Sequence, residues 1–314
     1  MHQIAKQFYF ADNPVLVIAG PTASGKTGTA LEVCETLDGE IVSADSMQIY
    51  RGMNIGTAKS TAEERQHVPH HMLDIRDPGQ RYSVADYKND ASEAIRDIYR
   101  RGKRPILCGG TGQYLSALIE GLNFTEIPTD LELRQQLNLE VEQKGIESLF
   151  QKLHSIDPEA ASRLSLSDQK RIVRALEVYR QTGQTISQLN IASRQAGPDF
   201  CFKSFCLNHD RPILYQRINQ RVEEMISDGL ADEVKKLLLN GLAPDSNCWQ
   251  AIGYKEMLPY LNGDTGLAEI TADIQQATRR YAKRQLTWFR KMNDLNWLMN
   301  QSAAESAKII LKNL

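Results

Sequence analysis

An eight-residue segment near the amino terminus, GPTASGKT, has every fixed position of the phosphate-binding pattern G-x-x-x-x-G-K-T. The glycines let the backbone turn so that successive N–H groups point at phosphate oxygens. Lys26 would neutralise the terminal phosphate, and the Thr27 hydroxyl would ligate Mg²⁺. The pattern predicts a site for a Mg-diphosphate and does not specify what the diphosphate is attached to. The segment consists of Gly20, Pro21, Thr22, Ala23, Ser24, Gly25, Lys26 and Thr27.

A single carboxylate, Asp45, follows the short apolar pair Ile41-Val42. In open α/β sheets, ligands bind outside the carboxyl ends of the strands, which is where Asp45 would lie. It could bind Mg²⁺ as a Walker-B-type aspartate or act as a general base. It could also be the N-cap of a helix that begins near Met47, because Asp is a favoured capping residue. The pattern alone leaves these three roles open.

Residues 274–293 carry six cations and no carboxylate, in a chain whose net charge is −2. Arg280 and Arg284 are spaced i, i+4 on a predicted helix. Like charges in that arrangement repel by roughly a few tenths of a kcal/mol unless an anion lies across them. We therefore expect phosphate contacts here, and a solvated basic face is the alternative. The six cations are Arg279, Arg280, Lys283, Arg284, Arg290 and Lys291.

The elements that must position these residues alternate between strands and helices. An apolar run at 15–19 enters the glycine-rich segment, and residues 28–37 are helical. An amphipathic helix at 83–102 is followed by a buried strand within 104–112. This alternation predicts an α/β fold of the P-loop NTPase-like class, in which a parallel sheet is flanked by helices.

Residues 119–199 have helical periodicity and little strand signal, and they are predicted to form an all-helical insertion domain. Residues 200–209 return to β character, as if the chain rejoined the sheet. We therefore expect a discontinuous catalytic core, residues 1–118 plus 200–314, interrupted by the insertion. Further helices are predicted at 211–229, 231–241, 249–262 and 268–291.

The composition excludes several classes of protein. No run of about 18 apolar residues is present, so we expect no membrane span. Five cysteines form no CxxC pair and the amino terminus has no signal pattern, which favours a reducing cytosol. His70 and His71 have no third ligand at metal-binding spacing and are expected in a loop. The net charge provides no overall basic field, so a nucleic acid would be bound by local patches.

Several blocks of the sequence, in the same order throughout, resemble the tRNA dimethylallyltransferase family, also called tRNA isopentenyltransferases. The most informative are DSMQIYRGMNIGTAK at 45–59, GGTGQYLSAL at 109–118 and TRRYAKRQLTWFRK at 278–291. The resemblance extends over about residues 14–298, with further blocks at 69–78, 82–87, 170–178, 217–234 and 251–256.

The resemblance implies transfer of a dimethylallyl group from dimethylallyl diphosphate to N6 of the adenosine next to the tRNA anticodon on its 3′ side. It implies that the GPTASGKT segment binds the pyrophosphate with Mg²⁺ and that Asp45 is the base near N6. It also implies that Arg217 or Arg221 holds the pyrophosphate. We expect a cytoplasmic monomer. Lys170 stands where the family usually has Gln. The tRNA anticodon stem-loop is expected to contact Asp45, Ser46, Met47, Gln48, Thr111, Arg134, Lys170, Arg171, Arg174, Arg280, Lys283 and Arg284.

Three other functions share parts of this pattern. A small-molecule kinase of the P-loop class would have the same loop and Mg²⁺, but it leaves the carboxylate-free helix unexplained. A non-catalytic RNA-binding or regulatory protein would not need Asp45 beside the loop. A relative that prenylates free AMP or ATP would not need the long helical insertion. Transfer of a labelled dimethylallyl group to tRNA, with AMP in parallel, separates the three.

Overall fold

The computed structural model describes residues 13–123, 127–195, 197–243 and 246–314. The chain forms two compact units. One comprises Met1–Ile119 and Asp199–Leu314, and the other comprises Glu120–Pro198. Within the described residues, no helix combines the length and the apolar character that a membrane crossing requires.

The first unit is built on a six-stranded sheet with the order β3-β2-β4-β1-β5-β6. All neighbouring strands are parallel, and the central strand β1 pairs with both β4 and β5. The P-loop follows β1, so the predicted α/β fold of the P-loop NTPase-like class is confirmed. The strands are β1 (Val15–Ala19), β2 (Gly39–Ser43), β3 (His70–His71), β4 (Arg104–Gly109), β5 (Phe202–Asn208) and β6 (Leu295–Met299).

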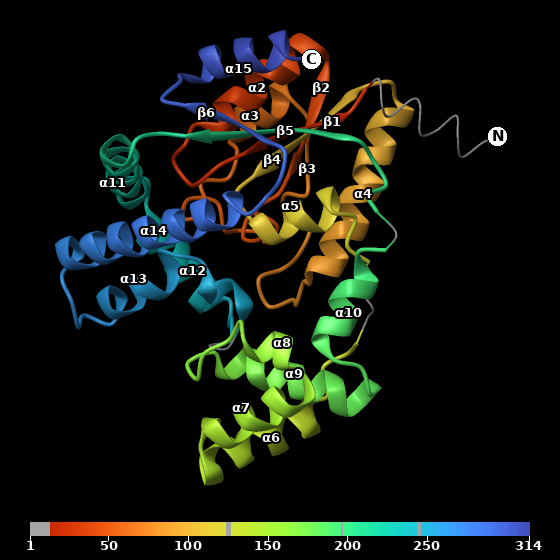
Figure 1. The fold of residues 1–314 in the computed structure, drawn as a ribbon. Helices are drawn as coiled ribbons and strands as arrows, with labels where there is room; N and C mark the ends of the chain where they lie inside the picture. Colours follow the sequence, from red (N-terminus) through yellow and green to blue (C-terminus); the bar gives the residue numbers. More distant parts are fainter. Residues whose placement is uncertain (1–12, 124–126, 196, 244–245) are drawn as a thin grey trace. The chain divides into compact units, whose positions relative to one another are not determined.

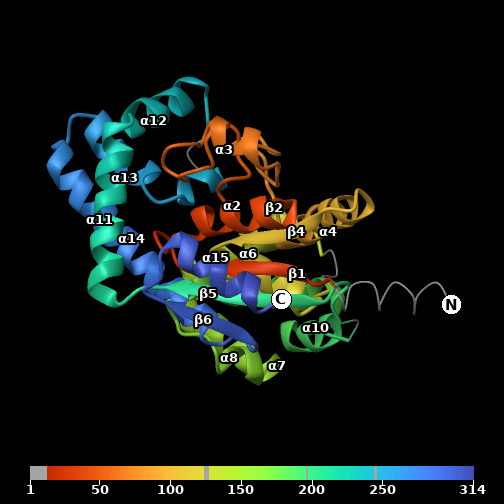
Figure 2. The ribbon, with the colours of Figure 1, turned by 90° about the horizontal axis from the view of Figure 1, so that it is seen from above.

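Helices cover both faces of this sheet (Figures 1 and 2). One face packs against α2 (Lys26–Leu37) and α15 (Ala303–Lys312), and the other packs against α4 (Val84–Arg100) and α5 (Gly112–Ile119). Because both faces are covered, all five residues of β1 are buried, as expected of a central parallel strand.

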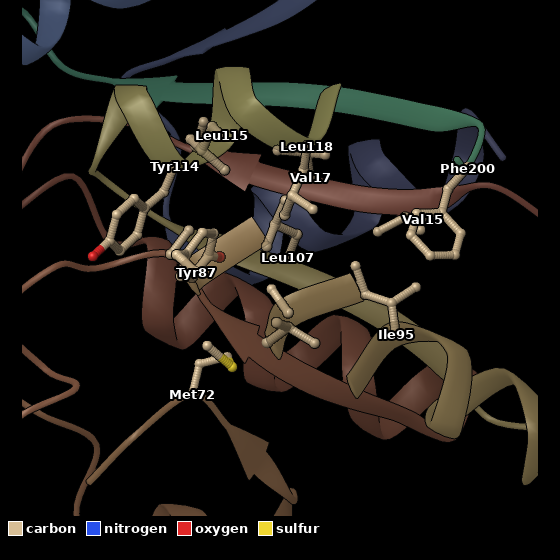
Figure 3. Close-up of a cluster of buried hydrophobic side chains, with 14 of the residues drawn as sticks. Val15, Val17, Met72, Tyr87, Ile95, Leu107, Tyr114, Leu115, Leu118 and Phe200 are labelled. Atoms are coloured by element: carbon tan, nitrogen blue, oxygen red, sulfur yellow. The ribbon is translucent and has the colours of Figure 1, made fainter. Parts of the chain in front are cut away.

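The core under α4 and α5 reaches the carboxyl edge of the sheet (Figure 3). There the rings of Tyr87 and Tyr114 stack with their centroids 3.8 Å apart. The Tyr87 hydroxyl donates a hydrogen bond to the carbonyl oxygen of Ser43 over 3.0 Å. This bond ties α4 to the end of β2, two residues before Asp45, and so fixes where the chain leaves the sheet.

A group of C-terminal helices packs on the segment that follows β2. Ile49, Tyr50 and Met53 are buried against Trp249 and Tyr254 in one apolar cluster. The segment is therefore held from outside the sheet as well as by β2. The helices are α11 (Arg211–Ser227), α12 (Leu230–Leu239), the short 3-10 helix η1 (Asn247–Gln250), α13 (Tyr254–Leu261) and α14 (Leu267–Phe289).

The second unit consists of helices around an apolar core of its own, which includes Leu137, Leu149 and Leu176. Asp157 stabilises it by accepting hydrogen bonds from the backbone N–H groups of Ala160 and Ser187, both over 3.0 Å. The helices are α6 (Leu131–Lys144), α7 (Ile146–Ile156), α8 (Pro158–Ala161), α9 (Gln169–Thr182) and α10 (Ile186–Ser193).

Some local expectations were wrong. His70 and His71 do not lie in a loop but form the edge strand β3, and the His71 Nε2 lies 2.6 Å from a carboxylate oxygen of Glu40. The helix expected over 249–262 is interrupted, because Gly253 adopts a φ of 97°. The elements α3 (Ala62–His67), β6 and α15 were not predicted.

Candidate active site

The P-loop is shaped by two glycines. Gly20 has a φ of 152°, and a Cβ there would lie 2.4 Å from the carbonyl oxygen of Leu207, so no other residue fits. Gly25, with a φ of 91°, is the N-cap of α2 and offers no side chain to its first turn. The N–H groups of that turn therefore remain available to an anion, together with the positive end of the helix dipole.

Lys26 is held inside the loop that it serves. Its Nζ donates a hydrogen bond to the carbonyl oxygen of Pro21 over 2.6 Å. The pKa of Lys26 is lowered to about 8, mainly by burial and to a smaller extent by Arg221, while Cys108 and Asp45 oppose the shift. A bound diphosphate would restore the charged form, because its oxygens replace the lost hydration with opposite charge.

The two arginines of α11 make different contacts. The Arg217 Nε donates a hydrogen bond to the carbonyl oxygen of Ala23 over 2.8 Å, so Arg217 supports the loop itself. Burial lowers the pKa of Arg221, and the neighbouring Asp45 carboxylate opposes that shift. Among the described residues, no hydrogen bond or ion pair engages the Arg221 guanidinium, although it lines the same pocket. Only the Nε of Arg217 is engaged, so among the described residues both arginines keep N–H donors for a phosphate.

Asp45 caps a turn and not a helix, which corrects one of the three expected roles. Its Oδ1 accepts a hydrogen bond from the backbone N–H of Met47 over 2.9 Å, and no helix begins there. The chain makes a turn at 46–49, and Ile49 and Tyr50 are then buried in the apolar cluster. No described residue donates to the other carboxylate oxygen, which leaves it free to accept a proton or bind a cation.

The other residues expected near the base shape the pocket through backbone contacts. The Thr111 hydroxyl accepts a hydrogen bond from the backbone N–H of Ser46 over 3.0 Å. The Gln48 amide nitrogen donates to the carbonyl oxygen of Thr57 over 3.1 Å, and Met47 packs against the helical cluster. These contacts fix the segment on either side of Asp45.

Glu233 is a residue of the site that the sequence did not reveal. It is only 8% exposed. Its carboxylate accepts hydrogen bonds from the backbone N–H groups of Asn54 and Ile55, at 2.8 and 2.9 Å, and from the Tyr254 hydroxyl at 2.6 Å. The buried negative charge thus fixes the loop at 54–56, which lines the pocket. The only signal was a pair of acidic residues, Asp232 and Glu233, in the first turn of α12, and such residues are typical of ordinary helices.

The basic helix α14 presents several of its cations without carboxylate partners. Arg280 and Lys283 are exposed, and Arg284 lies 5.6 Å from the centre of the Tyr281 ring. Arg279 is already engaged, because its guanidinium donates to the Asn219 side chain over 2.6 Å. None of the ion pairs found among the described residues involves this helix. Arg280, Lys283 and Arg284 therefore remain able to bind phosphates.

In the helical unit, two of the residues expected to contact tRNA form ion pairs within the unit. The Arg134 and Arg174 guanidiniums lie 2.6 and 3.0 Å from the carboxylate of Glu177, which is fully buried. Their charges compensate that carboxylate, which would otherwise be very unfavourable. Lys170 and Arg171 lie exposed in the first turn of α9, and the one ion pair of Arg171 among the described residues is with Asp168. Whether these four residues contact RNA stays a prediction.

A pocket of about 1320 Å³ joins these groups within the first unit. It exceeds the roughly 300–1,000 Å³ of most small-molecule sites, so it has room for two reacting groups. Its lining includes Thr22, Lys26, Thr27, Asp45, Arg217, Arg221, Tyr281 and Arg284.

The residues present fit a diphosphate with Mg²⁺. The Ser24 hydroxyl in the loop is buried and has no hydrogen-bond partner in the described part of the chain. Thr27 is exposed to the pocket. No three His, Cys, Asp or Glu residues cluster as a metal site where the structure is described. Mg²⁺ usually takes one or two protein oxygens and completes its shell with phosphates and water, so the Thr27 hydroxyl would be its protein ligand here.

Comparison with known proteins identifies relatives over nearly the whole chain. The family model described as IPP transferase matches residues 48–292. A tRNA dimethylallyltransferase of Thermoanaerobacter sp. is 46% identical over 285 residues, which is 90% of each chain. The crystal structure of the full-length tRNA isopentenylpyrophosphate transferase from Bacillus halodurans is 41% identical, with a TM-score of 0.69 and 96% of both chains covered. A eukaryotic dimethylallyltransferase acting on tRNA is 30% identical, with a TM-score of 0.81 over 96% of this chain and 80% of that one.

Proposed function

The chain belongs to the tRNA dimethylallyltransferase family, and from this membership we propose that it transfers the dimethylallyl group of dimethylallyl diphosphate to tRNA. The acceptor is N6 of the adenosine next to the anticodon on its 3′ side. The observation that carries the proposal is the free carboxylate oxygen of Asp45 in the same pocket as Lys26 and Arg221. A proton acceptor and a cationic cradle for a leaving group are thus combined in one site.

The reaction requires two changes at one allylic carbon. The C–O bond to the diphosphate breaks and its electron pair leaves with the pyrophosphate, while N6 of the adenine forms the new C–N bond. Lys26, Arg221 and the loop N–H groups stabilise the charge that develops on the leaving group, which is usually the largest catalytic contribution. Asp45 accepts the proton that N6 loses, and a positioned base contributes roughly 10²–10⁴-fold.

Mg²⁺ would be held by the Thr27 hydroxyl and the diphosphate oxygens, and when bound it adds charge neutralisation to the leaving group. Arg217 has two contributions in this scheme, because its terminal N–H groups remain available to the pyrophosphate. Its bond to Ala23 keeps the loop in the shape that surrounds the pyrophosphate.

The tRNA is expected along α14, with the helical unit contributing Lys170 and Arg171. The target adenosine must leave its stack to reach a buried donor, at a cost of a few kcal/mol that is smallest for unpaired nucleotides. All five cysteines are free thiols, which supports a reducing cytosol as the place of action.

The test is incubation with labelled dimethylallyl diphosphate, Mg²⁺ and unmodified tRNA, with AMP and ATP as parallel acceptors. We expect label in tRNA only, at a single adenosine. Label in AMP or ATP alone would assign the chain to free-nucleotide prenylation. Transfer of phosphate from ATP to a small hydroxyl compound, without any prenyl transfer, would favour the kinase.

A further inference from the structure

Gln285 lies on the buried side of α14, between the basic helix and the sheet. It is only 5% exposed, and both ends of its amide are used. The side-chain oxygen accepts a hydrogen bond from the backbone N–H of Thr22 over 2.9 Å. The side-chain nitrogen donates to the carbonyl oxygen of Gly110, also over 2.9 Å. One side chain therefore connects a helix with two loops that are distant in the sequence.

The contact with Gly110 leaves no space for a larger residue. A Cβ at that position would lie 2.3 Å from the Gln285 side-chain nitrogen. Replacing the amide by an apolar group of similar size would leave the buried carbonyl of Gly110 and the partly buried N–H of Thr22 without this partner, which is unfavourable. The amide thus has one defined orientation and links the loops rigidly.

The two loops serve different halves of the pocket. Thr22 belongs to the P-loop, and its N–H is engaged by Gln285, so it is withdrawn from the groups that face phosphate. Gly110 precedes Thr111, whose hydroxyl holds the backbone N–H of Ser46 beside Asp45. Gln285 is therefore one hydrogen bond away from the diphosphate cradle and two away from the turn that carries the base.

The helix that carries Gln285 also carries the cations available to RNA. Arg284 is its immediate neighbour, and Ala282 packs with Ala23 of the P-loop in one apolar cluster. A shift of α14 on binding RNA would be transmitted to the P-loop through these packed and hydrogen-bonded contacts. α14 (Figure 1) is in direct contact with the P-loop through the Gln285–Thr22 hydrogen bond and the packing of Ala282 on Ala23.

We propose that Gln285 is a positioning residue that couples RNA binding on α14 to diphosphate binding in the P-loop. The inference rests on the proposed function, since it assumes that both ligands bind. The coupling is reciprocal: each ligand raises the affinity for the other by the same factor, for which about 5–150-fold is typical. It acts by fixing the P-loop and the turn at Gly110 in their bound arrangement.

The experiment measures binding without turnover. The dissociation constants of inorganic pyrophosphate with Mg²⁺ and of an unmodified anticodon stem-loop RNA are determined separately, and each again in the presence of the other. The ratio gives the coupling factor for the wild-type chain. We expect Gln285→Leu to reduce this factor to about one, with a smaller change in either affinity alone. Gln276→Leu, at an exposed position of the same helix, is the matched control and should keep the wild-type factor.

A second variant preserves the test if Gln285→Leu does not fold. Gln285→Glu retains an acceptor for the Thr22 N–H but sets a carboxylate oxygen against the carbonyl of Gly110, so it should also reduce the factor. A wild-type factor in either folded variant, or no coupling in the wild-type chain, overturns the role of Gln285. Failure of the wild-type chain to bind RNA or pyrophosphate at all contradicts the proposed function itself, so the two failures are distinguishable.

Discussion

The depressed pKa of Lys26 predicts that affinity for pyrophosphate decreases above neutral pH. With a pKa of about 8 in the free protein, Lys26 is mostly charged at pH 7 and only about one-tenth charged at pH 9. Bound pyrophosphate requires the charged form, so binding above pH 8 must take up a proton. Deprotonation of Lys26 should therefore weaken pyrophosphate binding by ~10-fold between pH 7 and pH 9.

Pyrophosphate titrates in the same range, so a comparison is needed to isolate Lys26. Lys26→Arg provides it, because a guanidinium stays charged over the whole range. Dissociation constants of pyrophosphate with Mg²⁺ are measured by calorimetry for both proteins, and their ratio cancels the titration of the ligand. We expect the ratio of the wild-type dissociation constant to that of the variant to rise about tenfold from pH 7 to pH 9. A ratio that stays constant refutes the reasoning, because Lys26 would then not titrate near pH 8.

Three further predictions concern the base, the basic helix and the loop that lines the pocket. Asp45→Asn should lower kcat by roughly 10²–10⁴-fold with little change in pyrophosphate affinity, measured by single-turnover transfer and calorimetry; a lost affinity would indicate a metal ligand. Arg280→Ala with Arg284→Ala should raise KM for tRNA and reduce the slope of log affinity against log salt by about one per phosphate contact. An unchanged slope would exclude phosphate contact. Glu233→Gln should lower the free energy of unfolding by about 1–3 kcal/mol in urea titrations, because several backbone N–H groups lose a charged acceptor. The adjacent exposed Asp232→Asn should be nearly neutral, and equal losses in both variants would contradict the argument.

Features determined by neighbouring residues could be predicted from the sequence. The P-loop between an apolar strand and a helix is specified by residues close together in the sequence. The alternation of strands and helices that indicated a parallel sheet is also visible in short stretches of the sequence. The strand β3 is only two residues long, so its pairing with β2 depends on the assembled sheet and leaves no periodicity to detect. The turn at Asp45 was uncertain for a similar reason, because helices far along the chain hold the following residues.

The contacts that complete the site could not be predicted, because they join residues distant in sequence. Gln285 and Thr22 are 263 positions apart, and Glu233 and Asn54 are 179 apart. A glutamine on a basic helix and a glutamate near a helix start are common, and burial alone gives them their role. The ion pair of Arg134 with the buried Glu177 is a further contact of this kind, since 43 positions separate the two residues.

The position of β1 between β4 and β5 has a consequence for synthesis of the chain. β5 follows the helical unit in sequence, so one side of the strand that leads into the P-loop stays unpaired until the ribosome has made the segment beyond Asn208. The helices of Glu120–Pro198 have their own core and can fold in that interval. A nascent chain released before β5 would present the edge of β1, which is entirely apolar, and such edges promote aggregation. The pairing of the strand that leads into the diphosphate cradle is therefore complete only after β5 has been synthesised.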